Sequence, residues 1–194
     1  MAARSSLSTA QSSRLSLLSG FVAGVLAWIA GYVVTYLVVA PDLRDSGLNR
    51  LIEALDSEPA TAELVGWVFF NAHFVDTVFQ GLPIVGNETA SYVGGEGGFT
   101  VLLYLVPAVT LLVAGLALAM ANGTTDVSTG GLAGLTALPG YFLAAAVTAI
   151  TVEVTTAGAS AGPDLLAALI LAGVAYPIVL AGSGGVLAAV ANRR

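Results

Sequence analysis

Long apolar segments alternate with polar segments along the chain, and this pattern determines the predicted architecture. Four stretches are apolar for about 20 residues or more, the length an α-helix needs to cross the roughly 30 Å hydrocarbon core of a bilayer. A transmembrane β-strand would instead alternate apolar and polar residues over about 10 positions. The pattern therefore predicts an all-α fold: an integral membrane four-helix bundle in a single domain. The predicted spans cover residues 17–40, 100–121, 132–155 and 164–191.

The connection between the first two spans, residues 41–99, is too long for a simple turn, so we expect part of it to fold. Apolar residues recur at helical spacing between Leu48 and Leu55, which predicts a short amphipathic helix over residues 47–56. A second, aromatic-rich helix is predicted over residues 62–80. Its apolar core is short and is interrupted by polar residues, which favours an interfacial or re-entrant helix over a fifth span, the remaining alternative.

The placement of arginine predicts the orientation of the spans. Arg4 and Arg14 precede the first span, and Arg193 and Arg194 follow the last. Positive residues are enriched on the cytoplasmic side, so both termini are expected there and the long loop is expected outside the cell membrane. Asn87, in an Asn-Glu-Thr sequon, is then a possible glycosylation site. The first span is interpreted as a retained anchor because its apolar stretch exceeds the roughly 7–15 residues of a signal peptide.

Composition supports a membrane protein and excludes several function classes. Charged residues make up 9 % of the chain, whereas a soluble domain usually carries about 25 %. Six basic and twelve acidic residues give a net charge of −6, which argues against a nucleic-acid partner. Cysteine is absent and histidine occurs once, so thiolate chemistry and histidine-rich metal centres are excluded. We expect no cofactor and no metal, and we expect lipid, a membrane-protein partner or further copies of the chain as neighbours.

Four polar residues form a candidate cluster: Asn71, His73, Asp76 and Glu153. On a continuous helix, His73, Asp76 and Gln80 share one face and Asn71 points roughly the opposite way. A histidine oriented by a carboxylate is typical of metal and acid–base sites, but one such pair falls short of a metal centre. The favoured interpretation is a structural pair that ties the helix to the spans. Glu153 lies near the outer end of the third span, where its carboxylate can reach the interface.

Small residues mark faces where helix backbones can approach closely. Gly20 and Gly24 form a small-xxx-small pair in the first span, and Gly182, Gly184 and Gly185 form a smooth patch in the last. Packing within the four-helix bundle is the favoured interpretation of these residues. An interface with a partner or with a second copy is the alternative.

The segment from Gly66 to Asp76, GWVFFNAHFVD, resembles a motif of uncharacterised small multi-pass membrane proteins of haloarchaea. The resemblance covers the long loop and the general layout of the spans. It implies a halophilic source and no known activity. The absence of lysine and the acidic balance of the chain are typical of the same proteomes.

Three functions are compatible with the sequence. The leading one is a non-enzymatic accessory, assembly or scaffold subunit that binds a membrane partner or itself. The alternative is an oligomeric channel or carrier whose outer vestibule is lined by the polar cluster. A membrane enzyme that uses His73 and Asp76 ranks last because it would need further ligands from another chain.

Overall fold

The computed structural model describes residues 2–47, 49–50, 60–82, 86–95, 98–156 and 158–193. Within these residues, four helical stretches are long and apolar enough to cross a membrane. We call them the first to fourth long helices. They cover Leu17–Arg44, Val101–Ala121, Val127–Thr151 and Leu165–Ala191. The four predicted spans are therefore confirmed as long apolar helices, with ends that differ by at most about five residues.

Two of the long helices are continuous and two are interrupted. The first belongs to α1 (Ala2–Arg44), and the second is the 3-10 turn η1 (Val101–Tyr104) followed by α4 (Leu105–Ala121). The third consists of α5 (Val127–Leu135) and α6 (Leu138–Thr151). The fourth consists of α7 (Leu165–Ala167), the π-helical segments η2 (Ala168–Ala175) and η3 (Pro177–Ala181), and α8 (Gly182–Ala191).

Proline accounts for the interruptions because it has no N–H to donate and its ring clashes with the preceding turn. Pro139 is the second residue of α6 and directly follows the break at Thr136 and Ala137. In the fourth long helix the π-helical turns begin at Ala168, and Pro177 begins the second π-helical segment, η3. The interruptions are therefore local consequences of sequence within otherwise apolar helices.

A small antiparallel sheet covers one end of the bundle, so the prediction of an all-α fold is wrong there. In the described part of the chain, the strands lie in the order β2-β1-β4-β3. Strand β1 pairs with β4 from Thr77 opposite Pro163 to Gln80 opposite Ser160. The sheet thus joins the long loop to the connection between the third and fourth long helices. The strands are β1 (Thr77–Leu82), β2 (Gly86–Ala90), β3 (Val154–Thr156) and β4 (Ala159–Pro163).

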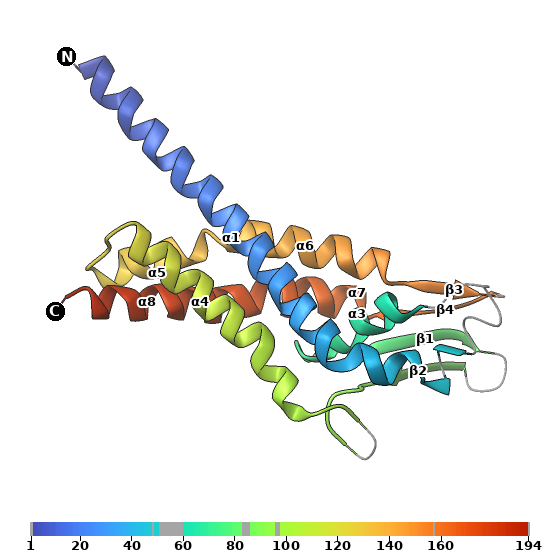
Figure 1. The fold of residues 1–194 in the computed structure, drawn as a ribbon. Helices are drawn as coiled ribbons and strands as arrows, with labels where there is room; N and C mark the ends of the chain where they lie inside the picture. The colour runs from blue at the N-terminus through green and yellow to red at the C-terminus, as the bar shows by residue number, and fades with distance from the viewer. Residues whose placement is uncertain are drawn as a thin grey trace.

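The predicted helix over residues 62–80 is shorter in the structure. Helix α3 (Thr61–Asn71) ends early, and the end of the predicted helix is the start of β1. Most of the amphipathic helix predicted over residues 47–56 lies outside the described residues. Figure 1 shows the sheet at one end of the bundle and both chain termini at the other. We call these the sheet end and the termini end.

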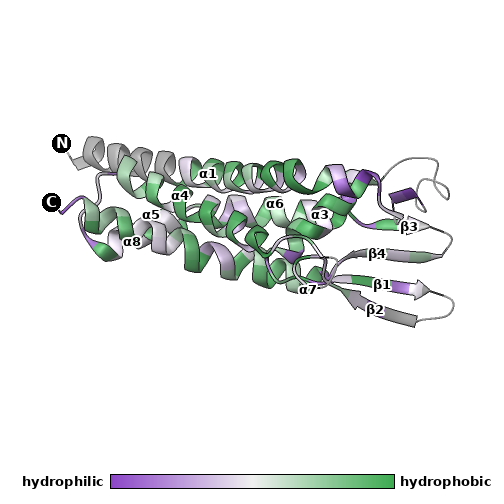
Figure 2. Cartoon of the chain, turned by 60° about the horizontal axis from the view of Figure 1, so that its bottom comes forward, coloured by the Kyte–Doolittle hydropathy of each residue, from purple (hydrophilic) through white to green (hydrophobic). Residues whose placement is uncertain are grey.

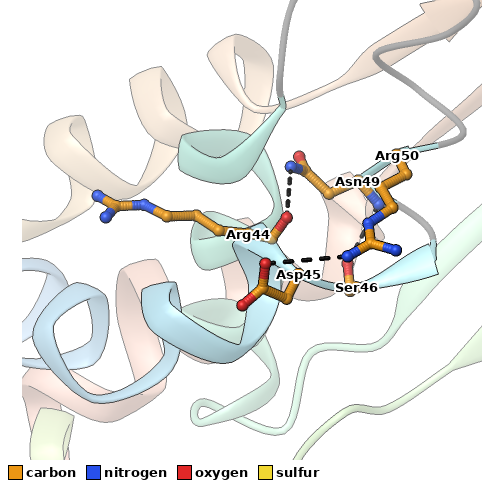
Figure 3. A network of polar contacts seen from close by, with 5 residues as sticks. All are labelled: Arg44, Asp45, Ser46, Asn49 and Arg50. Carbon is orange, nitrogen blue, oxygen red and sulfur yellow. Dashed lines mark hydrogen bonds and ion pairs between the residues drawn. The ribbon is translucent and has the colours of Figure 1, made fainter.

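A polar network closes the sheet end of α1 (Figure 3). The side-chain amide of Asn49 donates to the carbonyl of Arg44 over 3.4 Å, and the Asn49 N–H donates to the Ser46 hydroxyl over 3.1 Å. These bonds satisfy groups that the helix end leaves open. Arg50 and Asp45 lie 3.9 Å apart with largely exposed side chains, so this ion pair adds little stability.

Hydrophobic residues run along the whole length of the long helices (Figure 2). Many of the largest ones point outward: Leu37, Ile150 and Leu166 each expose about two thirds or more of their surface, at 71 %, 66 % and 68 %. A soluble protein rarely exposes apolar surface on this scale. The exterior of the bundle therefore matches a lipid environment better than water.

Glycines let the helices pack backbone against backbone. A Cβ atom on Gly115 of α4 or on Gly134 of α5 would lie 2.0 or 2.1 Å from the carbonyl oxygen of Ala181. The five glycines singled out from the sequence also lie between helices of this one chain. Their nearest neighbours are Thr136 for Gly20, Ala137 for Gly24, Leu135 for Gly182, Leu112 for Gly184 and Gly130 for Gly185.

The close approach at Gly134 predicts a large effect of a single methyl group. Gly134→Ala should lower the thermal unfolding midpoint in detergent, because the methyl must displace the Ala181 backbone, at a cost of about 1–3 kcal/mol. Gly131→Ala on the same helix is the matched control, because its Cβ would make ordinary contact with Val186 at 3.4 Å. Equal midpoints for the two variants would contradict the packing shown here.

Candidate functional site

The chain enters the bundle from the sheet end as α3, turns at residues 71–76 and leaves as β1. We call residues 71–76 the hairpin tip. Trp67 on α3 donates its indole N–H to the carbonyl of Val152, at the sheet end of the third long helix. The tip lies deeper, because His73 contacts Tyr141. Tyr141 is ten residues before Thr151, roughly 15 Å along the helix at 1.5 Å per residue. The segment is therefore re-entrant with respect to the bundle.

Helix α3 ends in a Schellman-type turn in which phenylalanine takes the place usually held by glycine. Phe74 has a φ of 60°, a left-handed conformation that is uncommon for a bulky residue. The Val75 N–H donates to the Phe70 carbonyl over 3.1 Å, and the Phe74 N–H donates to the Asn71 carbonyl over 2.9 Å. The Phe74 ring stacks on Tyr104 of η1 with centroids 4.5 Å apart, which helps to hold the strained residue in place.

Side chains bind backbone groups of the turn that follows α3. The Asn71 amide donates to the Val75 carbonyl over 2.7 Å, and its oxygen accepts the Tyr92 N–H over 2.8 Å. The Tyr176 hydroxyl donates to the Ala72 carbonyl over 3.2 Å. Because buried carbonyls are costly without a partner, these bonds explain why polar side chains occur within an apolar core.

His73 is the third side chain that binds backbone at the tip, and its hydrogen bonds determine its tautomer. Its Nδ1 lies 2.8 Å from the Phe69 carbonyl oxygen, which can only accept, so Nδ1 carries the proton. In the neutral ring Nε2 is then an acceptor, and the Tyr141 hydroxyl donates to it over 2.7 Å. His73 exposes none of its surface. This burial lowers the pKa of His73 to about 4, against the opposing effect of the Phe69 carbonyl. The imidazole is therefore neutral at pH 7.

Aromatic rings surround His73 on several sides. The Trp28 ring of α1 stacks on it at 5.3 Å with an interplanar angle of 29°, and the Tyr176 ring lies 4.8 Å away. The Trp28 indole N–H donates to the Thr148 hydroxyl of α6 over 2.9 Å. The hairpin tip thus connects α1, the third long helix and the fourth long helix.

The structure separates the four residues of the predicted polar cluster. Asn71 and His73 lie together at the buried tip, whereas Asp76 and Glu153 are exposed. The expectation that His73, Asp76 and Gln80 share a helical face is wrong, because α3 ends at Asn71 and Gln80 lies on β1. Glu153 lines a shallow cleft of about 390 Å³ at the sheet end. The possible glycosylation site, Asn87, lies in β2.

Sequence reasoning missed the partners of His73 on other helices: Trp28, Tyr141 and Tyr176. The sequence did carry a signal for these partners. Each is an aromatic residue with a polar atom inside an apolar span, and such residues usually have a hydrogen-bond partner when they are buried. Among the described residues, no three His, Cys, Asp or Glu side chains are grouped so that they could hold a metal ion.

The family model described as "Family of unknown function (DUF7978)" matches residues 1–192. The chain belongs to this family. The expectation of a family without known activity is thereby confirmed, whereas the haloarchaeal source stays a prediction. No curated protein and no solved structure matches the chain.

In this DUF7978 chain the tip is arranged for holding rather than for turnover. Both nitrogens of His73 already have partners within the chain, and the ring is enclosed. A general acid or base must reach a reacting group over hydrogen-bond distance, which His73 can do only if the tip moves. The geometry therefore assigns the polar tip the role of joining the re-entrant segment to the long helices.

The two bonds of Asn71 predict a clear loss of stability in the DUF7978 chain. Asn71→Ala leaves the Val75 carbonyl and the Tyr92 N–H without this partner, which should cost about 2–4 kcal/mol. A thermal melt in detergent followed by circular dichroism measures the effect. Gln80→Ala, an exposed change on β1, should leave the midpoint within about 1 °C. An unchanged midpoint for Asn71→Ala would disprove this role.

Proposed function

We propose that the chain is a multi-pass membrane protein that acts as a non-enzymatic accessory or scaffold subunit and binds one transmembrane helix of a partner protein. The observation that carries this proposal is an apolar groove of about 990 Å³ between α1 and α4. It runs along residues 19–30 of α1 and 109–122 of α4, about three helical turns. The groove lies in the half of the bundle nearer the termini.

The walls of the groove favour a helix as its occupant. Alanine supplies much of the lining, with Ala23, Ala27 and Ala30 on one side and Ala114, Ala117 and Ala121 on the other. Small residues let a second backbone come close, and close packing drives helix association where lipid removes the hydrophobic effect. Bulkier residues, Leu26, Val109, Val113 and Leu118, supply the rest of the apolar lining.

The lining also limits the chemistry of the partner. No charged residue lines the groove, so the matching segment is an uncharged, apolar helix. Thr110 and Asn122 in the lining already donate to the carbonyls of Pro107 and Leu118. Recognition in this proposal therefore depends on shape and close packing rather than on ion pairs.

The proposal includes an orientation in which the sheet end lies outside the cell membrane and both termini lie in the cytoplasm. Arg4 and Arg14 near one terminus and Arg193 at the other support it. In this arrangement residues 71–73 of the tip are enclosed between the long helices, whereas the carbonyl of exposed Asp76 accepts the Asp164 N–H at the outer start of the fourth long helix. Non-helical backbone inside a bilayer is tolerated only if it is buried in protein, and the enclosed hydrogen bonds of residues 71–73 meet that requirement.

The absence of cysteine makes the orientation easy to test. A single cysteine at exposed Glu153 should react with a membrane-impermeant maleimide on intact cells, because this residue lies at the sheet end. A single cysteine at exposed Thr125, at the termini end, should react only after the cells are opened. The reverse pattern of labelling would refute the orientation.

Photo-crosslinking tests the groove. A benzophenone amino acid at Ala117 should yield one defined crosslinked polypeptide in native membranes, and Ala30→Trp should reduce its yield at least about tenfold by filling the groove. Val147, which is 52 % exposed on α6, provides the matched controls: a crosslinker there should not capture that polypeptide, and Val147→Trp should not reduce the yield from Ala117. Crosslinks from Ala117 to lipid alone, or to a second copy of the chain, would overturn the proposal.

A further inference from the structure

His73 joins the hairpin tip to α1 and α6, in addition to the hydrogen bonds of Asn71 and the stacking of Phe74 on Tyr104. It binds the Phe69 carbonyl within its own segment and the Tyr141 hydroxyl of α6, and it stacks on Trp28 of α1. The Tyr176 hydroxyl adds one bond to the Ala72 carbonyl. A change at this one side chain therefore affects the attachment of the whole re-entrant segment.

The surroundings of His73 suit the neutral ring and offer no counter-charge to an imidazolium. Five aromatic side chains from α1, α3, α6 and the fourth long helix lie against the ring: Trp28, Phe69, Phe70, Tyr141 and Tyr176. Of these, the two tyrosines titrate, and neither is negatively charged in neutral or acidic solution. Within the described residues, no acidic side chain lies within ion-pair distance of His73. The carboxylates closest in sequence, Glu63 and Asp76, form no ion pair with the ring, and Asp76 is exposed.

We propose that the hairpin tip is an acid-sensitive latch: protonation of His73 places an unpaired charge inside the aromatic enclosure and releases the tip from the third and fourth long helices. The released imidazolium reaches water, and the carbonyls of Phe69 and Ala72 lose their side-chain donors. This device is independent of the proposed groove, which lies nearer the other end of the bundle.

The direction of the pH dependence follows from the burial of the ring. The pKa of His73 is about 4 in the closed tip, and a ring in water has a pKa near 6.5. The closed tip is therefore fully favoured above pH 6.5 and loses stability as the pH falls. The ratio of open to closed tip rises roughly tenfold for each pH unit between 6.5 and 4.

Because the chain contains one histidine, the nitrogen-15 NMR signals of histidine-labelled protein all come from His73 and report on the latch directly. Untagged protein in detergent should show the Nδ1-protonated neutral ring at pH 7. Hydrogen exchange of the amides of residues 73–75, corrected for the intrinsic rate, should accelerate roughly tenfold per pH unit below pH 6.5 and level off at the lower pH where the imidazolium signal appears. Protonation near pH 6.5 without a change in exchange would overturn the proposal, as would a flat exchange profile down to pH 4.

Two variants separate the latch from general acid unfolding. His73→Gln removes the titrating group, so the exchange of residues 73–75 should no longer accelerate between pH 6.5 and 4. Asp76→Asn removes the carboxylate closest to the tip on the C-terminal side and should leave the acceleration unchanged. Acceleration that persists in His73→Gln would disprove the proposal. If His73→Gln does not fold, the Asp76→Asn protein still decides the question: exchange that levels off at the pH where the imidazolium signal appears supports the latch, and exchange that keeps rising through that pH contradicts it.

Discussion

A helix that ends inside an apolar bundle leaves carbonyl groups far from water, and the rest of this structure is arranged around that constraint. Helix α3 stops at Asn71, and its last carbonyls need donors that a hydrophobic core does not supply. His73 donates to the Phe69 carbonyl in the last turn of α3, Tyr176 donates to the Ala72 carbonyl at the helix end, and Asn71 donates to the Val75 carbonyl in the turn that follows. The same side chains draw α1, α6 and the fourth long helix together around one point. The main role of the polar side chains in this core is thus to form hydrogen bonds with backbone groups.

The apolar pattern alone was enough to locate the four long helices, because runs of this length dominate every local preference. The sequence did not predict where α3 ends. The end of a helix is usually marked by glycine or proline, but here Phe74 adopts the left-handed conformation. Its ring stacks on Tyr104, which lies 30 positions later in the chain. Helical spacing therefore placed His73 with Asp76, although a turn separates them.

The sheet could not be predicted from the sequence because it too depends on contacts between distant segments. Strand β4 has the sequence Ala-Ser-Ala-Gly-Pro, which shows neither the β-branched residues nor the alternation that mark a strand. Its structure comes from pairing with β1, more than 70 residues earlier in the chain. Within the candidate site, Asn71 and His73 were visible in the sequence as polar residues in an apolar segment. Their partners Tyr141 and Tyr176 were not, because tertiary structure alone brings these helices together.

Strand pairing between β1 and β4 also sets an order of assembly. Residues 77–80 cannot form their ladder until residues 160–163 have been made and have reached the same end of the bundle. The re-entrant segment therefore cannot complete its packing until the third long helix has been inserted. Until then the aromatic residues of the segment stay exposed. Contacts of such long sequence separation slow folding, and a segment that waits with apolar rings exposed is where a chain of this kind is most open to misassembly. The pairing of β1 with β4 therefore forms only after the third long helix has been made, and the fourth long helix, residues 165–191, follows β4 in the chain.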